Sequence, residues 1–407
     1  MQVTSTILWV IFYLEEAIIA GYILIPFLSL TTYGIAKLFR IKTPFEKRPY
    51  VNNKQFEFGL VVTAHQETTF ITPLVDSILK QNYGNFFVYV VADDCDISTL
   101  SFPDKRVVIL QPEVPLHSKI KSIQYAMEHF KREHDAVIIF DVDNLIDRSF
   151  LKTINAYFQK GYRVVQSYFK PKNSDTLYEK MDAIGDMFNF FVEREARMVA
   201  GLSSTIWGSG VAIDLKLYKD VGYKDHLGGF DKKLQSHLVQ TVDRIAYAPD
   251  AILYDEKITS GASLETQRTR WIHSYFKYFK ENTQVLLTGL KKMDFNLIYF
   301  GINILRPPLF IVLGIALLFT AISFFVNTYM FIAWVIILTL FFLSFAAIVL
   351  IKGRDKKYFM ALLSMPLFAM RQAIALIKSG RAKRSFLRTE HTRLLYIEDM
   401  YAKEGKK

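Results

Sequence analysis

Cysteine is nearly absent from this chain, which has a single one, Cys95, among 407 residues. One cysteine excludes a framework of internal disulfide bonds and is compatible with a reducing compartment for the soluble part of the protein. The start of the chain lacks the basic region of a secretory signal, and no clean small-residue cleavage site follows its first apolar stretch. We therefore expect no cleavable signal peptide.

Negative charge is also in deficit, because 39 Asp and Glu stand against 50 Lys and Arg, for a formal net charge of +11. Such a chain could bind nucleic acid, but much of the basic excess falls beside apolar runs. This placement indicates attraction to anionic lipid, so we expect a lipid bilayer as a partner and no nucleic acid. The apolar share of 51% and the mean hydropathy of +0.17 are high for a cytosolic enzyme and point to membrane segments.

The first apolar stretch runs from about residue 7 to residue 38 and is long enough to cross a bilayer once, since about 20 residues suffice. Basic residues at 37–48 follow it directly, so the positive-inside tendency places the next part of the chain in the cytoplasm. Glu15 and Glu16 interrupt the stretch. They either lie at the far membrane interface, which we favour, or face other helices.

Between residues 57 and 288, short apolar strands alternate with amphipathic helices. The pattern predicts strands at 58–63, 86–92, 106–110 and 136–140 and helices at 71–81 and 119–132. Strands that alternate with helices imply right-handed crossovers and a mostly parallel α/β sheet, with the ligand at the carboxyl ends of the strands.

The sequence becomes membrane-like again beyond residue 294. Two strong spans, 309–326 and 329–351, are separated by a very short loop and predict an antiparallel hairpin. Residues 295–305 predict a helix along the interface. A third stretch, 359–377, contains Pro366 and Arg371, and basic residues follow it as far as Arg388. A full crossing would place that basic tail outside, so we favour an interfacial or re-entrant helix.

These segments predict four parts. They are a transmembrane helix with a basic juxtamembrane segment (1–50), a cytoplasmic domain (51–288), interfacial helices with a transmembrane hairpin (289–378) and a basic cytoplasmic tail (379–407).

Carboxylates follow two of the predicted strands. Asp93 follows strand 86–92, and Asp141 and Asp143 follow strand 136–140. An Asp-x-Asp pair at a strand terminus can share a divalent cation with the oxygens of a diphosphate, whose developing charge the cation neutralises. Asp-x-Asp alone is common in loops. Its position after a buried strand, in register with Asp93, favours a cation site.

A third acid, Asp231, follows a Gly228-Gly229-Phe230 turn. An acceptor hydroxyl is a poor nucleophile, so an inverting transfer needs a general base aimed at its proton, and Asp231 is the candidate. From local sequence alone, a helix N-cap after the Gly-Gly turn explains this residue nearly as well.

The string Gln267-Arg268-Thr269-Arg270-Trp271 lies between the acid-bearing domain and the second membrane region. On a helix, Gln267, Arg270 and Trp271 share one face, because they stand at i, i+3 and i+4. Arg270 can pair with a diphosphate, Trp271 offers a flat apolar face to a sugar ring, and Gln267 can hydrogen-bond a hydroxyl. The alternative is a helix surface with a stacked Trp-Arg pair.

Together these elements resemble membrane-integrated glycosyltransferases of family two, the group that holds cellulose, chitin and hyaluronan synthases and ceramide glucosyltransferase. The resemblance runs from Phe58 to about Trp271. It implies a GT-A-like, Rossmann-type α/β domain in the cytoplasm, with a mostly parallel sheet, flanked by transmembrane and interfacial helices. Matched to the family's motifs, the residues that the resemblance assigns to the nucleotide sugar are Glu67, Asp93, Lys119 and Asp141. It assigns Asp141 and Asp143 to Mg²⁺ or Mn²⁺, and Asp231 to base catalysis. The residues assigned to the acceptor and the diphosphate are Trp207, Gln267, Arg268, Arg270 and Trp271.

The chain departs from the family's pattern in several places, among them Lys232 and Lys233, which replace residues that are often acidic or apolar. Only Glu67 matches cleanly in the first nucleotide-binding turn, residues 63–67; Phe230 stands where an acid usually precedes the base; and His117-Ser118 stands where a glycine usually precedes Lys119. These changes either retune the acceptor or mark an inactive relative. The acid pair, the base and the Gln-Arg-Trp cluster all remain, which favours activity.

The leading hypothesis is inverting transfer from a UDP-sugar to a growing β-linked polysaccharide, with Mg²⁺ or Mn²⁺, at the cytoplasmic face of a plasma membrane such as a bacterial inner membrane. Transfer of one sugar to a lipid is the alternative, because the same motifs support it and few spans leave a monomer little material for a conduit. A non-catalytic membrane scaffold or sugar-nucleotide sensor is the third. A homo-oligomer is compatible with all three.

Overall fold

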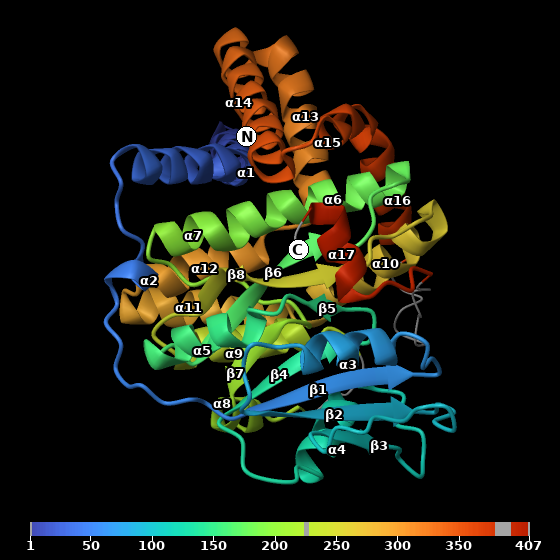
Figure 1. Ribbon diagram of the computed structural model, residues 1–407. Helices are drawn as coiled ribbons and strands as arrows, with labels where there is room; N and C mark the ends of the chain where they lie inside the picture. The colour runs from blue at the N-terminus through green and yellow to red at the C-terminus, as the bar shows by residue number, and fades with distance from the viewer. Residues whose placement is uncertain (1, 224–227, 379–391, 406–407) are drawn as a thin grey trace.

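An eight-stranded sheet forms the centre of the molecule in the computed structural model, which describes residues 2–223, 228–378 and 392–405 (Figure 1). The order across the sheet is β3-β2-β1-β4-β7-β6-β8-β5. The strands are β1 (Phe58–His65), β2 (Phe86–Asp93), β3 (Val107–Leu110), β4 (Ala136–Asp141), β5 (Leu145–Ile146), β6 (Val164–Pro171), β7 (Val211–Asp214) and β8 (Ala246–Asp255).

Most strand pairs are parallel, as the alternating pattern predicts. β3, β2, β1 and β4 run parallel to one another, β6 pairs in parallel with β8, and β7 lies antiparallel between β4 and β6. The four strands and two helices predicted between residues 58 and 140 are all present, with ends within a few residues of those expected. In the register of β1, His65 lies opposite Asp93 and Thr63 opposite Asp141, so the predicted acids meet at one edge of the sheet.

Helices cover both faces of the sheet, which explains why strands such as β1 are apolar almost throughout. On one face, α3 (Ile71–Leu79) and α5 (Phe150–Gln159) contribute Leu74 and Ile154 to a buried apolar cluster. On the other face, α4 (Lys119–Glu128), α8 (Leu215–Lys219) and α9 (Phe230–Thr241) contribute Ile123, Leu217 and Leu234 to a second cluster.

A long helical segment separates the sheet from the apolar helices (Figure 1). It consists of α6 (Leu177–Phe190), a π-helical turn at Phe191–Glu195 and α7 (Ala196–Val199). Three further helices complete the domain side of the molecule: α10 (Gly261–Lys277), α11 (Phe279–Lys292) and α12 (Phe295–Leu305).

Four helical segments in the described part of the chain are long and apolar enough to cross a membrane. They are residues 9–38 of α1 (Gln2–Leu38), α13 (Leu309–Val326), α14 (Thr328–Gly353) and residues 356–378, which comprise α15 (Lys356–Ala361), a 3-10 turn (Leu362–Ser364) and α16 (Met365–Lys378). A shorter helix, α2 (Pro44–Lys47), follows α1. The number and apolarity of the four long segments indicate integration into a membrane.

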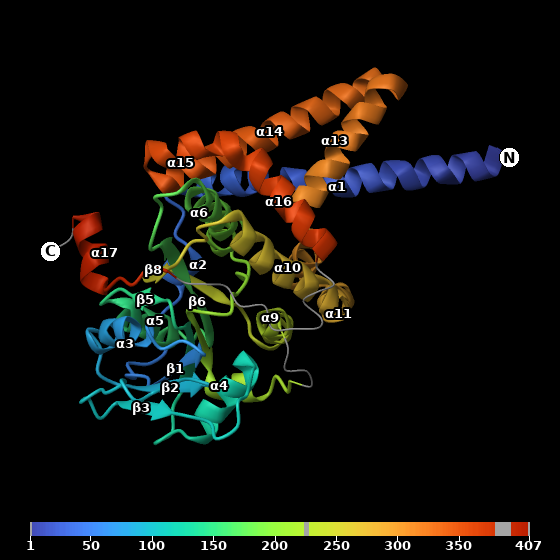
Figure 2. The same cartoon turned by 90° about the vertical axis from the view of Figure 1, so that its right-hand side faces the viewer.

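The apolar helices α1, α13 and α14 lie side by side and extend away from the α/β domain (Figure 2). The hairpin predicted at 309–351 is present as α13 and α14. One buried apolar cluster joins Ile23 of α1, Ala316 of α13 and Ile348 of α14 to Phe191 of the π-helical turn. The membrane helices are therefore packed directly onto the segment that covers the sheet.

Glu16 does not lie at an open interface, where we had favoured placing it. It is 3% exposed, and its Oε1 accepts hydrogen bonds from Trp334 Nε1 at 3.0 Å and from Ser323 Oγ at 3.4 Å. The second alternative, an acid that faces other helices, is the one found. A carboxylate among apolar helices is costly unless it has such donors, and those donors stand on α13 and α14.

The two C-terminal segments contact the α/β domain. α16 packs along α10, and Arg371, the charge inside the third apolar stretch, donates to Glu265 at 2.7 Å. Within the expected basic tail, α17 (Ile397–Glu404) packs against α3. The basic positions of that tail up to Arg388 lie outside the described residues.

Candidate active site

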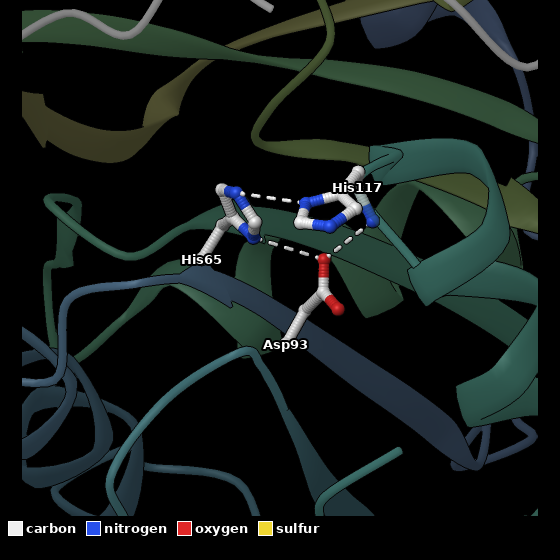
Figure 3. A group of neighbouring side chains, drawn as sticks. All are labelled: His65, Asp93 and His117. Atoms are coloured by element: carbon white, nitrogen blue, oxygen red, sulfur yellow. Dashed lines mark hydrogen bonds and ion pairs between the residues drawn. The ribbon is translucent and has the colours of Figure 1, made fainter. Parts of the chain in front are cut away.

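Asp93 ends β2 and is almost fully buried, with 1% of its surface exposed. Its carboxylate accepts hydrogen bonds from the backbone N–H groups of Leu116, at 2.6 Å, and His117, at 2.9 Å. His65 Nδ1 lies 3.0 Å from Asp93 Oδ2 (Figure 3). Two backbone donors thus hold the carboxylate in place, and the His65 ring lies against it, directly beside the first predicted nucleotide-binding turn.

Two histidines that the motif comparison gave no role stand over Asp93. His65 comes from β1 and His117 from the loop before α4, and His65 Nε2 lies 3.5 Å from His117 Nδ1 (Figure 3). Ligand atoms of the three side chains lie within 4.8 Å of one another, so this group could hold a metal ion. The available signal was that both histidines stand where the family's motifs are broken. His117 has φ of +48°, a conformation that favours glycine.

Lys119 links Asp141 with the Gly208 carbonyl. It begins α4, which Ser118 caps by accepting the Lys121 N–H at 3.4 Å. Its Nζ donates to Asp141 Oδ1 at 2.5 Å and to the Gly208 carbonyl at 2.8 Å. A lysine at this point places positive charge where the phosphates of a bound nucleotide would need it.

The acid pair after β4 is held by a turn. The Asp141 N–H donates to Asn144 Oδ1 at 3.0 Å, and Asn144 Nδ2 donates to Asp255 Oδ1 at 3.2 Å. The Asp141 side chain is 45% exposed, whereas Asp143 is 4% exposed. Asp141 therefore faces the opening of the site and Asp143 lies beneath the surface.

Asp143 is surrounded by groups at the ends of β6 and β8. The Glu256 N–H donates to Asp143 Oδ2 at 3.4 Å, and Lys172 Nζ donates to the Asp143 carbonyl at 2.8 Å. Burial raises the pKa of Asp255 to about 7, against the opposing charge of Lys257, and burial lowers the pKa of Lys172. Sequence reasoning missed these residues, because no recognisable spacing links them to the Asp-x-Asp pair.

Asp231 is not a helix cap. The N-cap of α9 is Gly229, with φ of 66°, and no side chain caps the helix. Asp231 stands in the first turn, with Lys232 Nζ 3.9 Å from its Oδ2. A Cβ placed on Gly208 would lie only 3.8 Å from the Asp231 Cβ, so the carbonyl that Lys119 contacts and the predicted base are neighbours.

Gln267 and Arg270 stand on α10. Burial lowers the pKa of Arg270, and the negative charge of Asp141, which lies close enough to act on the guanidinium, opposes that shift. Gln267 Oε1 is buried and has no hydrogen-bond partner among the described residues. A ligand hydroxyl would satisfy this acceptor. Glu67, by contrast, accepts the N–H of Thr69 at 2.9 Å and shapes the turn after β1.

Trp271 is 42% exposed and rests on the guanidinium of Arg268, whose Cζ lies 4.0 Å from the indole centroid. Arg268 also donates to Asp182 at 2.6 Å. The alternative, a stacked Trp-Arg pair, is thus present, and Arg268 rather than Arg270 makes it. Trp207 continues the stack, 6.2 Å from Trp271 and with the Arg194 guanidinium 4.6 Å from its own ring.

The site combines the half-exposed carboxylate of Asp141 with the cations of Lys119 and Arg270. It also holds the carboxylate of Asp231, which lies next to Gly208, and the exposed indole of Trp271. Such a group of side chains can bind a phosphate ester with a hard cation, hold an apolar ring face and accept a proton from a hydroxyl.

The sequence and the fold were compared with those of known proteins. The model of the family described as Glycosyltransferase like family 2 matches residues 55–274. No curated protein matches the sequence. The matched span includes every residue of the site from β1 to the Gln267–Trp271 string.

Among solved structures, the mannosyltransferase PcManGT from Pyrobaculum calidifontis, in complex with GDP-Man and Mn²⁺, has a TM-score of 0.51 at 15% identity, over 89% of this chain and 98% of that chain. TarS 1–349 from S. aureus, in complex with UDP-GlcNAc, has a TM-score of 0.42 at 17% identity, over 84% of this chain and 99% of that chain. The fold is thus GT-A-like, an α/β fold with a mostly parallel, curled sheet, accompanied by apolar helices that could span a membrane.

Proposed function

Because the chain belongs to the glycosyltransferase family 2-like proteins, we propose that it is a membrane-embedded, inverting glycosyltransferase that moves a sugar from a UDP-sugar to a growing β-linked polysaccharide. One observation carries this proposal. Lys119 Nζ contacts both Asp141 Oδ1 and the Gly208 carbonyl, and Gly208 adjoins Asp231. Lys119 thereby contacts Asp141, which we assign to the donor, and also the residue that adjoins the candidate base, Asp231.

The residues present fit a hard divalent cation. Asp141 and Asp143 would hold Mg²⁺ or Mn²⁺ through carboxylate oxygens, which these ions prefer, and the half-exposed Asp141 leaves room for phosphate oxygens. When bound, the cation neutralises negative charge on the diphosphate leaving group. The His65-Asp93-His117 group lies at the first nucleotide-binding turn, and we assign Asp93 to the nucleoside.

The chain's own side chains would divide the remaining work. Lys119 and Arg270 pair with the diphosphate, and Asp231 takes the proton from the acceptor hydroxyl as that oxygen attacks the sugar carbon. Trp271 and Trp207 offer a ring face to the acceptor, and Gln267 donates to or accepts from one of its hydroxyls. Arg268, which we had grouped with these contacts, is buried against Asp182, which supports a role in holding Trp271.

Transfer of a single sugar to a lipid is a second candidate. The observation that favours it is the direct packing of α1, α13 and α14 around Ile23, Ala316 and Ile348, because helices that pack on one another leave little space for a polymer between them. In both cases the Arg371-Glu265 pair supports α16 as an interfacial helix beside the site, and the basic flanks support a cytoplasmic domain.

The full-length protein in nanodiscs, supplied with Mn²⁺ and a panel of labelled UDP- and GDP-sugars, should turn over one donor. The size distribution of the product separates polymer extension from single addition. Asp231→Asn should lose transfer by about 10²- to 10⁴-fold while it still binds nucleotide. Asp220→Asn, which changes an exposed acid at the end of α8, is the matched control and should transfer normally.

Two results would contradict the proposal. Failure of the folded wild type to turn over any nucleotide sugar would remove both enzyme functions and leave the scaffold or sensor. Transfer by Asp231→Asn at the wild-type rate would remove Asp231 as the base but leave the transferase activity in place.

A further inference from the structure

The C-terminal residues 392–404, here named the strap, lie against the α/β domain although they follow the last apolar helix by more than ten residues in the sequence. The strap begins with an extended stretch, 392–396, and continues as α17. Its apolar side, which includes Ile397, Met400 and Tyr401, forms a buried cluster with Leu145 of β5 and Tyr254 of β8.

Polar contacts fix the strap at both ends. Lys80, the C-cap of α3, donates to Glu398 at 2.9 Å, and Lys170 of β6 donates to Glu404 at 2.9 Å. The Arg148 N–H donates to Tyr401 Oη at 3.0 Å. Contacts to α3, β6 and the loop after β5 define one docked position for this helix.

The extended part of the strap holds the side chain of Glu256. The backbone N–H groups of Thr392 and Arg393 donate to Glu256 Oε1 at 2.7 and 3.2 Å. Arg393 also pairs with Glu179, at 3.3 Å, and with Asp175, at 3.2 Å. Glu179 is fully buried, so this pairing anchors the start of the strap in the domain.

Glu256 in turn contacts Asp143, because its N–H donates to Asp143 Oδ2. A second route leads to the same acid. Lys403 Nζ of the strap donates to the Lys172 carbonyl at 3.3 Å, and Lys172 Nζ donates to the Asp143 carbonyl. Two routes therefore connect the strap with Asp143. The first ends on its carboxylate, through the backbone N–H of Glu256, and the second ends on its backbone carbonyl.

From these contacts we propose that the strap is part of the cation site, and that Glu256 is a positioning residue through which residues 392–393 hold Asp143. The proposal rests on the proposed function, in which Asp141 and Asp143 bind Mg²⁺ or Mn²⁺. Groups that hold the ligands of a metal are worth about 10- to 100-fold in metal affinity. Asp143 has little exposed surface, so its orientation depends on such neighbours rather than on water.

The test measures Mn²⁺ binding to the full-length protein in nanodiscs, by the electron paramagnetic resonance signal of the free ion, with Asp143→Asn as the variant that lacks the site. Glu256→Ala and Ile397→Asp should each weaken Mn²⁺ binding by about 10-fold or more. Glu256→Gln keeps an acceptor oxygen for the two N–H groups and should recover part of the loss. Leu394→Asp changes a half-exposed strap residue and is the control, with no change expected.

Hydrogen exchange gives a second measurement on the same samples. Glu256→Ala should speed exchange at residues 392–393, and Ile397→Asp should speed it along 392–404, while thermal unfolding shows that the domain is intact. Ile397→Ala is the milder replacement if Ile397→Asp does not fold.

The outcomes separate the two claims. If the wild type binds Mn²⁺ at the site that Asp143→Asn removes, but Glu256→Ala and the Ile397 variants bind it equally well, the strap has no part in the cation site and this inference is overturned alone. If the wild type shows no Mn²⁺ binding that depends on Asp143, the cation assignment in the proposed function is overturned, and the inference with it.

Discussion

Removal of Arg268 should destabilise the protein strongly, because its partner Asp182 would stay buried without a counter-charge. The two side chains are 9% and 5% exposed, and Arg268 Nη2 lies 2.6 Å from Asp182 Oδ1. Asp186, on the same helix, adds a neighbouring acid whose pKa burial and Asp182 both raise, against the charge of Lys257. Breaking such a buried pair costs roughly 3–5 kcal/mol.

The expected shift in melting temperature follows from the size of the domain. At about 2–4 °C per kcal/mol for domains of 150–250 residues, Arg268→Ala should lower Tm by roughly 6–20 °C. Arg163 and Asp214 make a matched Arg-Asp pair at 3.0 Å, but their side chains are 47% and 25% exposed. Arg163→Ala should cost less than about 1 kcal/mol. The double variant Arg268→Met with Asp182→Leu should recover most of the loss, since it removes both charges of the pair and leaves neither of them buried without its partner.

The assay is thermal unfolding of the full-length protein in nanodiscs, followed by tryptophan fluorescence, with nucleotide affinity measured well below Tm. Equal Tm shifts for Arg268→Ala and Arg163→Ala would refute the reasoning from burial. The affinity decides the role of Arg268. If it holds Trp271 and α10 in place, Asp182→Ala and Arg268→Ala should weaken nucleotide binding equally, whereas a direct contact with the diphosphate would make Arg268→Ala much the worse of the two.

Three further predictions concern the cation, a turn and pH. Asp143→Asn should abolish the Mn²⁺-dependent part of UDP binding, and unchanged binding in calorimetry would contradict the metal assignment. Gly229→Ala should reduce transfer, because φ is +66° and the new Cβ would lie 2.5 Å from Ser274 Oγ. Adding Ser274→Gly should restore part of the rate, because it removes that clash. Full activity of Gly229→Ala would show that the turn before Asp231 tolerates a side chain. Burial lowers the pKa of His134 from 6.5 to about 4, with Arg132 adding to the effect, so the unfolded chain takes up a proton first. Stability present above about pH 6.5 should therefore fall between pH 6.5 and 4, and urea unfolding of His134→Gln should show a smaller fall over that range; an equal fall would assign it to other groups.

Local sequence was sufficient for most of the secondary structure. The strands β1, β2 and β4 are continuous β-branched and apolar runs, and such runs form strands in a parallel sheet that is covered on both faces. The α13-α14 hairpin was equally predictable, because two long apolar runs with one short loop have few other conformations available.

The meeting of the acids was also predictable, because an acid at the carboxyl end of a parallel strand must reach the same edge of the sheet as its neighbours. Asp93 ends β2 and Asp141 ends β4, the two strands on either side of β1, and the register of β1 places His65 and Thr63 beside them. The neighbours of Asp143 could not be predicted in this way. Glu256 and Lys172 directly follow β8 and β6, and both reach Asp143 because those two strands pair in parallel, with a register shift at Ser167 and Tyr168.

The Gln267–Trp271 string shows the boundary between the two kinds of information. The i, i+3, i+4 spacing correctly predicts a helix that carries Gln267, Arg270 and Trp271 on related faces. The same spacing does not predict that Arg268, the residue after Gln267, donates to Asp182 and supports Trp271. That distinction depends on α6, which lies more than 75 residues earlier in the chain and supplies the buried carboxylate.

The α/β alternation, the apolar helices and the identity of the acids follow from the amino-acid sequence, because each of these is a property of residues close together in the chain. Which charged groups meet depends on the tertiary packing. Glu16 pairs with α13 and α14 rather than with solvent, Arg371 pairs with α10, and residues 392–404 return to the sheet beside Asp143. A charge can be brought out of water only where another element supplies its donor or its counter-charge, and that element is chosen by the packing of the whole chain.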